Sequence, residues 1–73
     1  MLRRVNISNN IRQLRFNANE MTQNELAIKV GVTRQTIVAI EKCKYYPSLE
    51  LAFLIAQVFD KLVIEVFDVN FDD

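Results

Sequence analysis

The chain has no histidine or tryptophan and contains one cysteine, one glycine and one proline among its 73 residues. Without histidine, and with a single cysteine, it offers no paired ligands of the kinds that hold zinc. The usual nucleophile and base pairs of covalent catalysis are equally hard to assemble. Because the lone Cys43 cannot form a disulfide within the chain, a reducing compartment is favoured. We therefore expect no metal, no cofactor and no enzymatic activity.

Long apolar runs are also missing. No stretch approaches the roughly 20 apolar residues that a membrane helix needs, and the N-terminal residues lack the apolar core of a signal peptide. A chain of this length hides only about 60% of its unfolded surface on folding. With 51% hydrophobic and 25% charged residues, its composition is typical of a globular protein. These features predict a soluble, cytoplasmic protein with a single domain over residues 1–73.

The net charge is zero, but the charges are unevenly distributed along the chain. Residues 1–49 carry eight of the nine basic side chains and three acids, whereas residues 50–73 carry one basic and six acidic side chains. Binding to a nucleic-acid backbone depends on lysine and arginine releasing counterions from phosphates. The asymmetry therefore indicates a basic side that faces DNA and an acidic side that faces away. Chance segregation in a short chain is the alternative.

Residues 22–48, TQNELAIKVGVTRQTIVAIEKCKYYPS, contain two short amphipathic helix patterns separated by a tight turn. Thr22 and Glu25 have the spacing of a capping box, so the first helix begins there. Gly31 can adopt the positive φ that ends this helix. Thr33 follows as the N-cap of the second helix. This succession is a helix-turn-helix signature.

The second helix directs Ile37 and Ile40 inward and leaves polar residues at the start of its opposite face. A helix fits the major groove of DNA, and arginine and glutamine match the bidentate hydrogen-bonding patterns of guanine and adenine there. The alternative is that these side chains are ordinary solvated residues of a first helical turn. Combined with the caps and the glycine turn, the pattern favours DNA reading. The residues predicted to read bases are Arg34, Gln35, Thr36 and Ala39.

The same stretch resembles the Cro and phage-repressor-like helix-turn-helix family, often called the Xre family, through TQNELA, VGVTRQTI, AIEK and YPSLELA. The resemblance spans about residues 8–67. It implies an all-α, five-helix, lambda-repressor-like DNA-binding domain that acts as a dimeric regulator at a palindromic operator. It gives Arg34 and Gln35 the role of a base-reading pair and Gln23 that of a phosphate contact. Ala39, at a position that is often polar in the family, can offer only an apolar contact.

The resemblance also implies a partly buried ion pair between Arg15 of the first helix and Glu41 at the end of the reading helix. A solvent-exposed Arg15 is the alternative. From the sequence, Ser8 is expected to cap this first helix, which runs to about Ala18. A fourth helix is expected over residues 48–59 and a short fifth helix near residues 62–67.

The segment KCKYYPS, which follows Glu41, supplies side chains suited to phosphate oxygens. The ring of Tyr46, next to Pro47, has the alternative of packing on the domain. Cys43 stands where the family usually has a glycine, so we expect it either to be strained or to end the helix in another way. The residues predicted to contact the DNA backbone are Gln23, Thr33, Lys42, Lys44, Tyr45 and Tyr46.

Both ends of the chain are rich in strand-forming residues. We predict terminal strands over residues 1–7 and 66–72, paired as an antiparallel sheet beside a helical body over residues 8–67. Because an isolated two-stranded sheet is marginal in water, its apolar face is expected to pack against a second subunit. Fraying of both termini is the alternative. The predicted dimer residues are Val5, Ile7, Phe67, Val69 and Phe71.

Taken together, the sequence predicts a regulator of transcription that binds double-stranded DNA sequence-specifically, and in particular a repressor that acts as a homodimer on an inverted repeat. Two alternatives remain open. The chain is an antitoxin whose acidic C-terminal half grips a basic toxin, or it is a protein-interaction module on a helix-turn-helix scaffold, since a fold does not fix a function.

Overall fold

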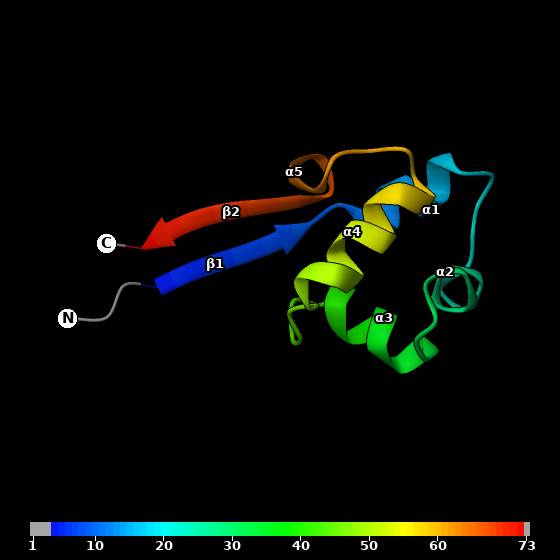
Figure 1. The fold of residues 1–73 in the computed structure, drawn as a ribbon, viewed down its shortest axis with the longest axis horizontal. Coiled ribbons are helices and arrows are strands. Elements are labelled where there is room, and N and C mark those ends of the chain that lie inside the picture. Colours follow the sequence, from blue (N-terminus) through cyan, green and yellow to red (C-terminus); the bar gives the residue numbers. More distant parts are fainter. Residues whose placement is uncertain (1–3, 73) are drawn as a thin grey trace.

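The computed structural model describes residues 4–72, and in this range it contains five helices and two strands (Figure 1). In chain order these are β1 (Arg4–Asn9), α1 (Ile11–Asn17), α2 (Gln23–Val30), α3 (Arg34–Glu41), α4 (Leu49–Val58), α5 (Val63–Val66) and β2 (Phe67–Asp72). The helices form a compact body, from which the two strands project as a ribbon, with the Arg4–Asp72 pair at its outer tip. The predicted five-helix domain with a small antiparallel sheet is confirmed.

Three helices begin at side-chain caps. At the start of α2, the Glu25 amide donates to Thr22 Oγ1 (3.0 Å) and the Thr22 amide donates to Glu25 Oε1 (3.1 Å), which completes the expected capping box. The hydrogen bonds from the Thr22 amide and hydroxyl lower the pKa of Glu25 below its ordinary value of 4.5. The hydroxyls of Thr33 and Ser48 cap α3 and α4. These caps fix where the two helices of the motif start.

The first helix begins later than the sequence suggested. β1 continues through Asn9, Asn10 is the N-cap and α1 starts at Ile11, so the prediction that Ser8 caps this helix is wrong. Pairing with β2 draws Ser8 into the strand, because a tertiary contact overrides the local capping preference. The side chain of Asn9 accepts from the Ile11 amide (3.2 Å) and donates to the Ile40 carbonyl (2.9 Å). Asn9 therefore links the base of the ribbon to both α1 and α3.

Helices α2, α3 and α4 are each followed by a residue in the left-handed conformation. Gly31 does this after α2 with a φ of 78°, whereas Cys43 and Asp60 do so after α3 and α4 with φ of 59° and 55°. The amides of Cys43 and of the lysine after it donate to the carbonyls of Ile40 and Ala39 in the last turn of α3 (3.0 and 2.9 Å). Cys43 thus ends α3 with the geometry that glycine usually supplies.

Substituting Cys43 by glycine is expected to stabilise the fold by about 0.5–1 kcal/mol. An L-residue in the left-handed region costs about 1–2 kcal/mol, and the larger unfolded-state entropy of glycine offsets about 0.5–1 kcal/mol of the gain. The melting temperature should rise by a few degrees. The control is Cys43→Ala, which removes the thiol but keeps Cβ and should melt close to the wild type. An equal rise in both variants would show that the thiol, and not the backbone, is the source of strain.

One apolar core unites the helices and the base of the ribbon. It is built from aliphatic residues at helical spacing, together with small alanines on α2 and α4. The buried members are Ile11, Leu26, Ala27, Val30, Ile37, Ile40, Leu51, Ala52, Ile55, Ala56, Val66 and Phe67. Two of these residues, Ile37 and Ile40, belong to α3. Their burial determines which face of α3 points into the core and therefore which face points to solvent.

The ribbon has one apolar and one polar face. β1 and β2 are antiparallel, with Ile7 opposite Val69 and Val5 opposite Phe71, so these four residues share a face. Ile7 packs against the core, whereas Val5 and Val69 are 41% and 45% exposed. The other face carries Arg4, Asn6, Ser8, Asp68 and Asn70. The ribbon therefore presents an apolar strip beyond the point where it leaves the body.

The prediction for Phe67 needs correction. This residue was expected at the dimer interface, but its side chain belongs to the core and is only 7% exposed. It starts β2 directly after α5, at the base of the ribbon, where the alternating face meets the helical body. Residues 1–3 of the expected first strand lie outside the described residues.

Candidate nucleic-acid interface

The first turn of α3 presents the side chains that were expected to read bases. Ile37 and Ile40 are buried, while Arg34 and Gln35 are exposed and Thr36 and Ala39 are half-buried. In Figure 1, α3 lies at the outer edge of the helical body, with α4 between it and α5. Arg34, Gln35 and Thr36 thus lie in the first turn, and Ala39 about one turn further along, on a helix that the core holds in place.

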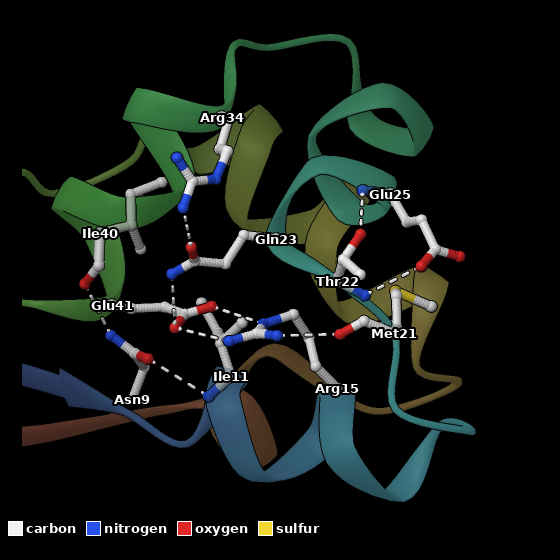
Figure 2. Close-up of polar contacts among 10 residues, drawn as sticks. All are labelled: Asn9, Ile11, Arg15, Met21, Thr22, Gln23, Glu25, Arg34, Ile40 and Glu41. Atoms are coloured by element: carbon white, nitrogen blue, oxygen red, sulfur yellow. Dashed lines mark hydrogen bonds and ion pairs between the residues drawn. The ribbon is translucent and has the colours of Figure 1, made fainter.

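An ion pair anchors the far end of this helix. Arg15 donates from Nε to Glu41 Oε2 (2.7 Å) and from Nη2 to Glu41 Oε1 (3.0 Å), and a third bond runs from Nη1 to the Met21 carbonyl (2.8 Å). The two side chains are only 13% and 9% exposed. The guanidinium therefore ties α1, the loop before α2 and the end of α3 together (Figure 2). Two parallel bonds of this kind give directional as well as electrostatic stabilisation.

Gln23 extends this cluster to the outward edge of α3. Its Nε2 donates to Glu41 Oε1 (3.3 Å), and its Oε1 accepts from Arg34 Nη2 (3.4 Å) (Figure 2). Both contacts are long for hydrogen bonds, so the contact from Gln23 holds the Arg34 guanidinium only weakly. Gln23, which was expected at the DNA backbone, is half-buried and lies between the ion pair and the first turn of α3.

The other residues predicted to contact the DNA backbone lie at the two ends of α3. The Thr33 hydroxyl oxygen accepts from the Thr36 amide (3.2 Å) and lies 3.0 Å from the Thr36 hydroxyl. The capping bond uses only an acceptor lone pair, so it does not prevent the O–H from donating to a phosphate. Lys42 and Lys44 are exposed at the end of α3. Tyr45 and Tyr46 each expose about half of their surface. The structure thus brings cationic and phenolic groups next to the helix without tying them to the protein core.

Sequence reasoning missed two residues near this surface. Asn9 was overlooked because nothing in the local pattern marks an asparagine at the end of a strand as a contact to a helix 31 positions away. Arg12 was overlooked because one exposed arginine on an amphipathic helix carries no pattern of its own. Both line a surface groove shared with Gln23 and Arg34.

Two kinds of alternative site find no support in the part of the chain that the structure describes. Among residues 4–72, no group of three or more acidic, histidine or cysteine side chains is arranged to hold a metal ion. No helix in that range has the length and apolar character to cross a membrane. The surface around α3 is therefore the strongest candidate site.

Comparison with known proteins gives consistent matches. A helix-turn-helix family model matches residues 11–66. An uncharacterized HTH-type transcriptional regulator of Archaeoglobus fulgidus is 58% identical over 53 residues, which is 73% of each chain. One from Methanocaldococcus jannaschii is 57% identical over 47 residues, covering 64% of this chain and 71% of the relative. The HTH-type regulator YgzD of Bacillus subtilis is 43% identical over 61 residues, covering 84% and 91%.

Proposed function

Since this chain belongs to the Xre-type helix-turn-helix family of DNA-binding transcriptional regulators, which are not enzymes, we propose that it is a repressor that binds an inverted-repeat operator as a homodimer. Arg34 and Gln35 read base edges in the major groove with their long polar side chains. The smaller side chains of Thr36 and Ala39 add further contacts to the bases. Occupancy of an operator that overlaps a promoter blocks RNA polymerase. The protein acts in the cytoplasm, where this DNA is accessible.

The observation that carries the proposal is the exposed first turn of α3 on a rigid support. Arg34 and Gln35 are exposed in the first turn of a helix whose other face is buried through Ile37 and Ile40. The Arg15–Glu41 ion pair fixes the end of the same helix. Base reading requires such support, because bidentate contacts to guanine or adenine tolerate little displacement of the donor.

The homodimer is supported by the apolar face of the ribbon. Val5 and Val69 are partly exposed on this face, and Phe71 is exposed beside them. An isolated two-stranded ribbon is marginal in water, and a twofold axis lets the same strip on two copies cover itself. Such a dimer needs its two reading helices about 34 Å apart, one turn of duplex DNA.

The hydrogen bonds of Asn9 give the dimer a way to set that spacing. Asn9 ends β1, and its side chain binds the Ile40 carbonyl in the last turn of α3. The orientation of the ribbon, and hence of the partner subunit, is thereby coupled to the orientation of the reading helix.

Two substitutions separate base reading from backbone binding. We expect Gln35→Ala to reduce discrimination at one base pair by about 1–3 kcal/mol. Lys44→Ala should weaken binding to all sequences alike and lower the slope of log affinity against log salt by about 0.9 per subunit. The measurement is a set of titrations with a selected operator and its single-base variants at several salt concentrations. The opposite assignment of the two effects would contradict the proposed contacts.

The function itself is tested by a mobility-shift selection with genomic fragments. Enrichment of a fragment that contains an inverted repeat supports the proposal. If no fragment shifts at low salt, the result contradicts the repressor proposal and favours the protein-interaction alternative. Co-purification with a basic toxin encoded beside the gene would favour the antitoxin alternative.

A further inference from the structure

A shallow groove of about 630 Å³ runs between α1, α2 and α3. It starts at the outward edge of α3, where Arg34 and Gln23 line it, and reaches across to Arg12 on α1. Lys42, at the end of α3, lines it as well. Three elements of the fold thus contribute to one depression that is continuous with the proposed base-reading edge.

We propose that this groove receives the DNA backbone beside the major groove, and that Arg12 is a phosphate-binding residue. The inference rests on the proposed DNA-binding function and extends its contact surface to α1. When a reading helix lies in the major groove of DNA, the sugar-phosphate backbone runs along both edges of that groove. A depression in the protein surface beside the reading helix therefore lies against phosphates and not against bases.

The charges that line the groove favour an anion. Arg15 and Glu41 both lie in it, but their bidentate ion pair cancels their charges locally. That leaves Arg12, Arg34 and Lys42 against the single remaining acid, Glu20. The groove therefore carries a positive excess, although the whole chain is neutral.

Arg12 is a cation of the groove that no other polar contact among residues 4–72 engages. Its side chain is exposed, and within the described residues it makes no hydrogen bond or ion pair. Arg15, three residues further along α1, is by contrast fully engaged with Glu41 and Met21. An unpaired guanidinium presents planar donors that match the oxygens of a phosphate. Gln23 and Asn24 add neutral amide donors to the lining from α2.

Glu20 provides a test in which the expected change in DNA affinity is an increase. It is exposed in the loop between α1 and α2 and lines the same groove. A carboxylate there repels a phosphate, so its neutralisation should strengthen DNA binding. A residue outside the backbone path would have no such effect, because exposed charges beyond about 10 Å are screened at 0.1 M salt.

The experiment measures binding of a mixed-sequence DNA duplex over a series of salt concentrations. Arg12→Gln should weaken binding about fivefold at about 0.1 M salt, where distant charges are screened, and lower the salt slope by about 0.9 per subunit. Arg12→Lys should retain most of the slope, and Glu20→Gln should raise the affinity. The matched control is Lys61→Gln, the same charge change at an exposed residue between α4 and α5, and it should behave like the wild type. Thermal unfolding of each variant verifies the fold.

The outcomes distinguish a failure of the groove proposal from a failure of the proposed function. If the wild type binds DNA but Arg12→Gln matches Lys61→Gln, the groove does not hold the backbone, and the proposed function stands without it. A Glu20→Gln variant that binds no better than the wild type counts against the groove in the same way. If the wild type binds no duplex at low salt, both the groove and the proposed function fall.

Discussion

Replacing Glu41 by alanine is expected to destabilise the fold by roughly 3 kcal/mol, the lower end of the range found when one partner of a buried ion pair is removed, because this pair is partly buried. Arg15 would keep its charge in a site where it is now only 13% exposed, and of its three hydrogen bonds only the one to the Met21 carbonyl would remain. Small domains have a total stability of about 5–15 kcal/mol. Chemical denaturation should therefore show a greatly lowered midpoint with an unchanged m-value.

Two further variants separate the charge from the contact. In Arg15→Lys, the positive charge remains but the two parallel bonds to Glu41 are lost, so an intermediate loss is expected. The double substitution Arg15→Met with Glu41→Leu removes both charges and should recover much of the lost stability, since apolar pairs of similar volume often replace buried ion pairs without loss. A double variant as unstable as Glu41→Ala would show that the pair stabilises by a mechanism other than compensating a buried charge.

Replacing Val69 by aspartate is expected to convert the protein to a monomer and to reduce its affinity for an inverted repeat by about 100-fold or more, because two linked half-site contacts become independent. Val69 is 45% exposed on the apolar face of the ribbon, opposite Ile7. A carboxylate at this position would place an uncompensated charge in the proposed subunit interface. Its exposure means that the helical body should keep its fold.

The neighbouring residue provides a matched control. Asn70→Asp adds the same charge one position away, on the polar face of the ribbon. Analytical ultracentrifugation should find Asn70→Asp dimeric and Val69→Asp monomeric, and only the latter should lose affinity for the operator. If both variants remain dimers, the apolar face of the ribbon is not the interface.

Local signals predicted most of the helix-turn-helix well. The helix caps are Thr22, paired with Glu25, and Thr33, and the partners of each cap lie within three residues. Gly31 supplies the positive φ that the end of α2 requires at that position. Such signals depend on short segments of chain, so the sequence displays them directly. The family resemblance then suggested the partners Arg15 and Glu41, which are 26 residues apart.

Features set by tertiary contact were predicted less well. Ser8 has the character of a cap, but strand pairing incorporates it into β1. Phe67 continues the apolar alternation of β2, but its place at the base of the ribbon puts it in the core. The link from Gln23 to Arg34 depends on the crossing of α2 and α3, and the groove beside Arg12 depends on three helices at once. None of these leaves a periodic trace in the sequence.

If the protein reads DNA as we propose, the exposed first turn of α3 lies against the bases of the operator. The most direct test is an NMR titration of the amide signals with a selected operator duplex. We expect the largest shifts at residues 33–36, with further changes at Gln23 and around Lys44. Shifts confined to the ribbon or α5, with the first turn of α3 unaffected, would contradict this proposal.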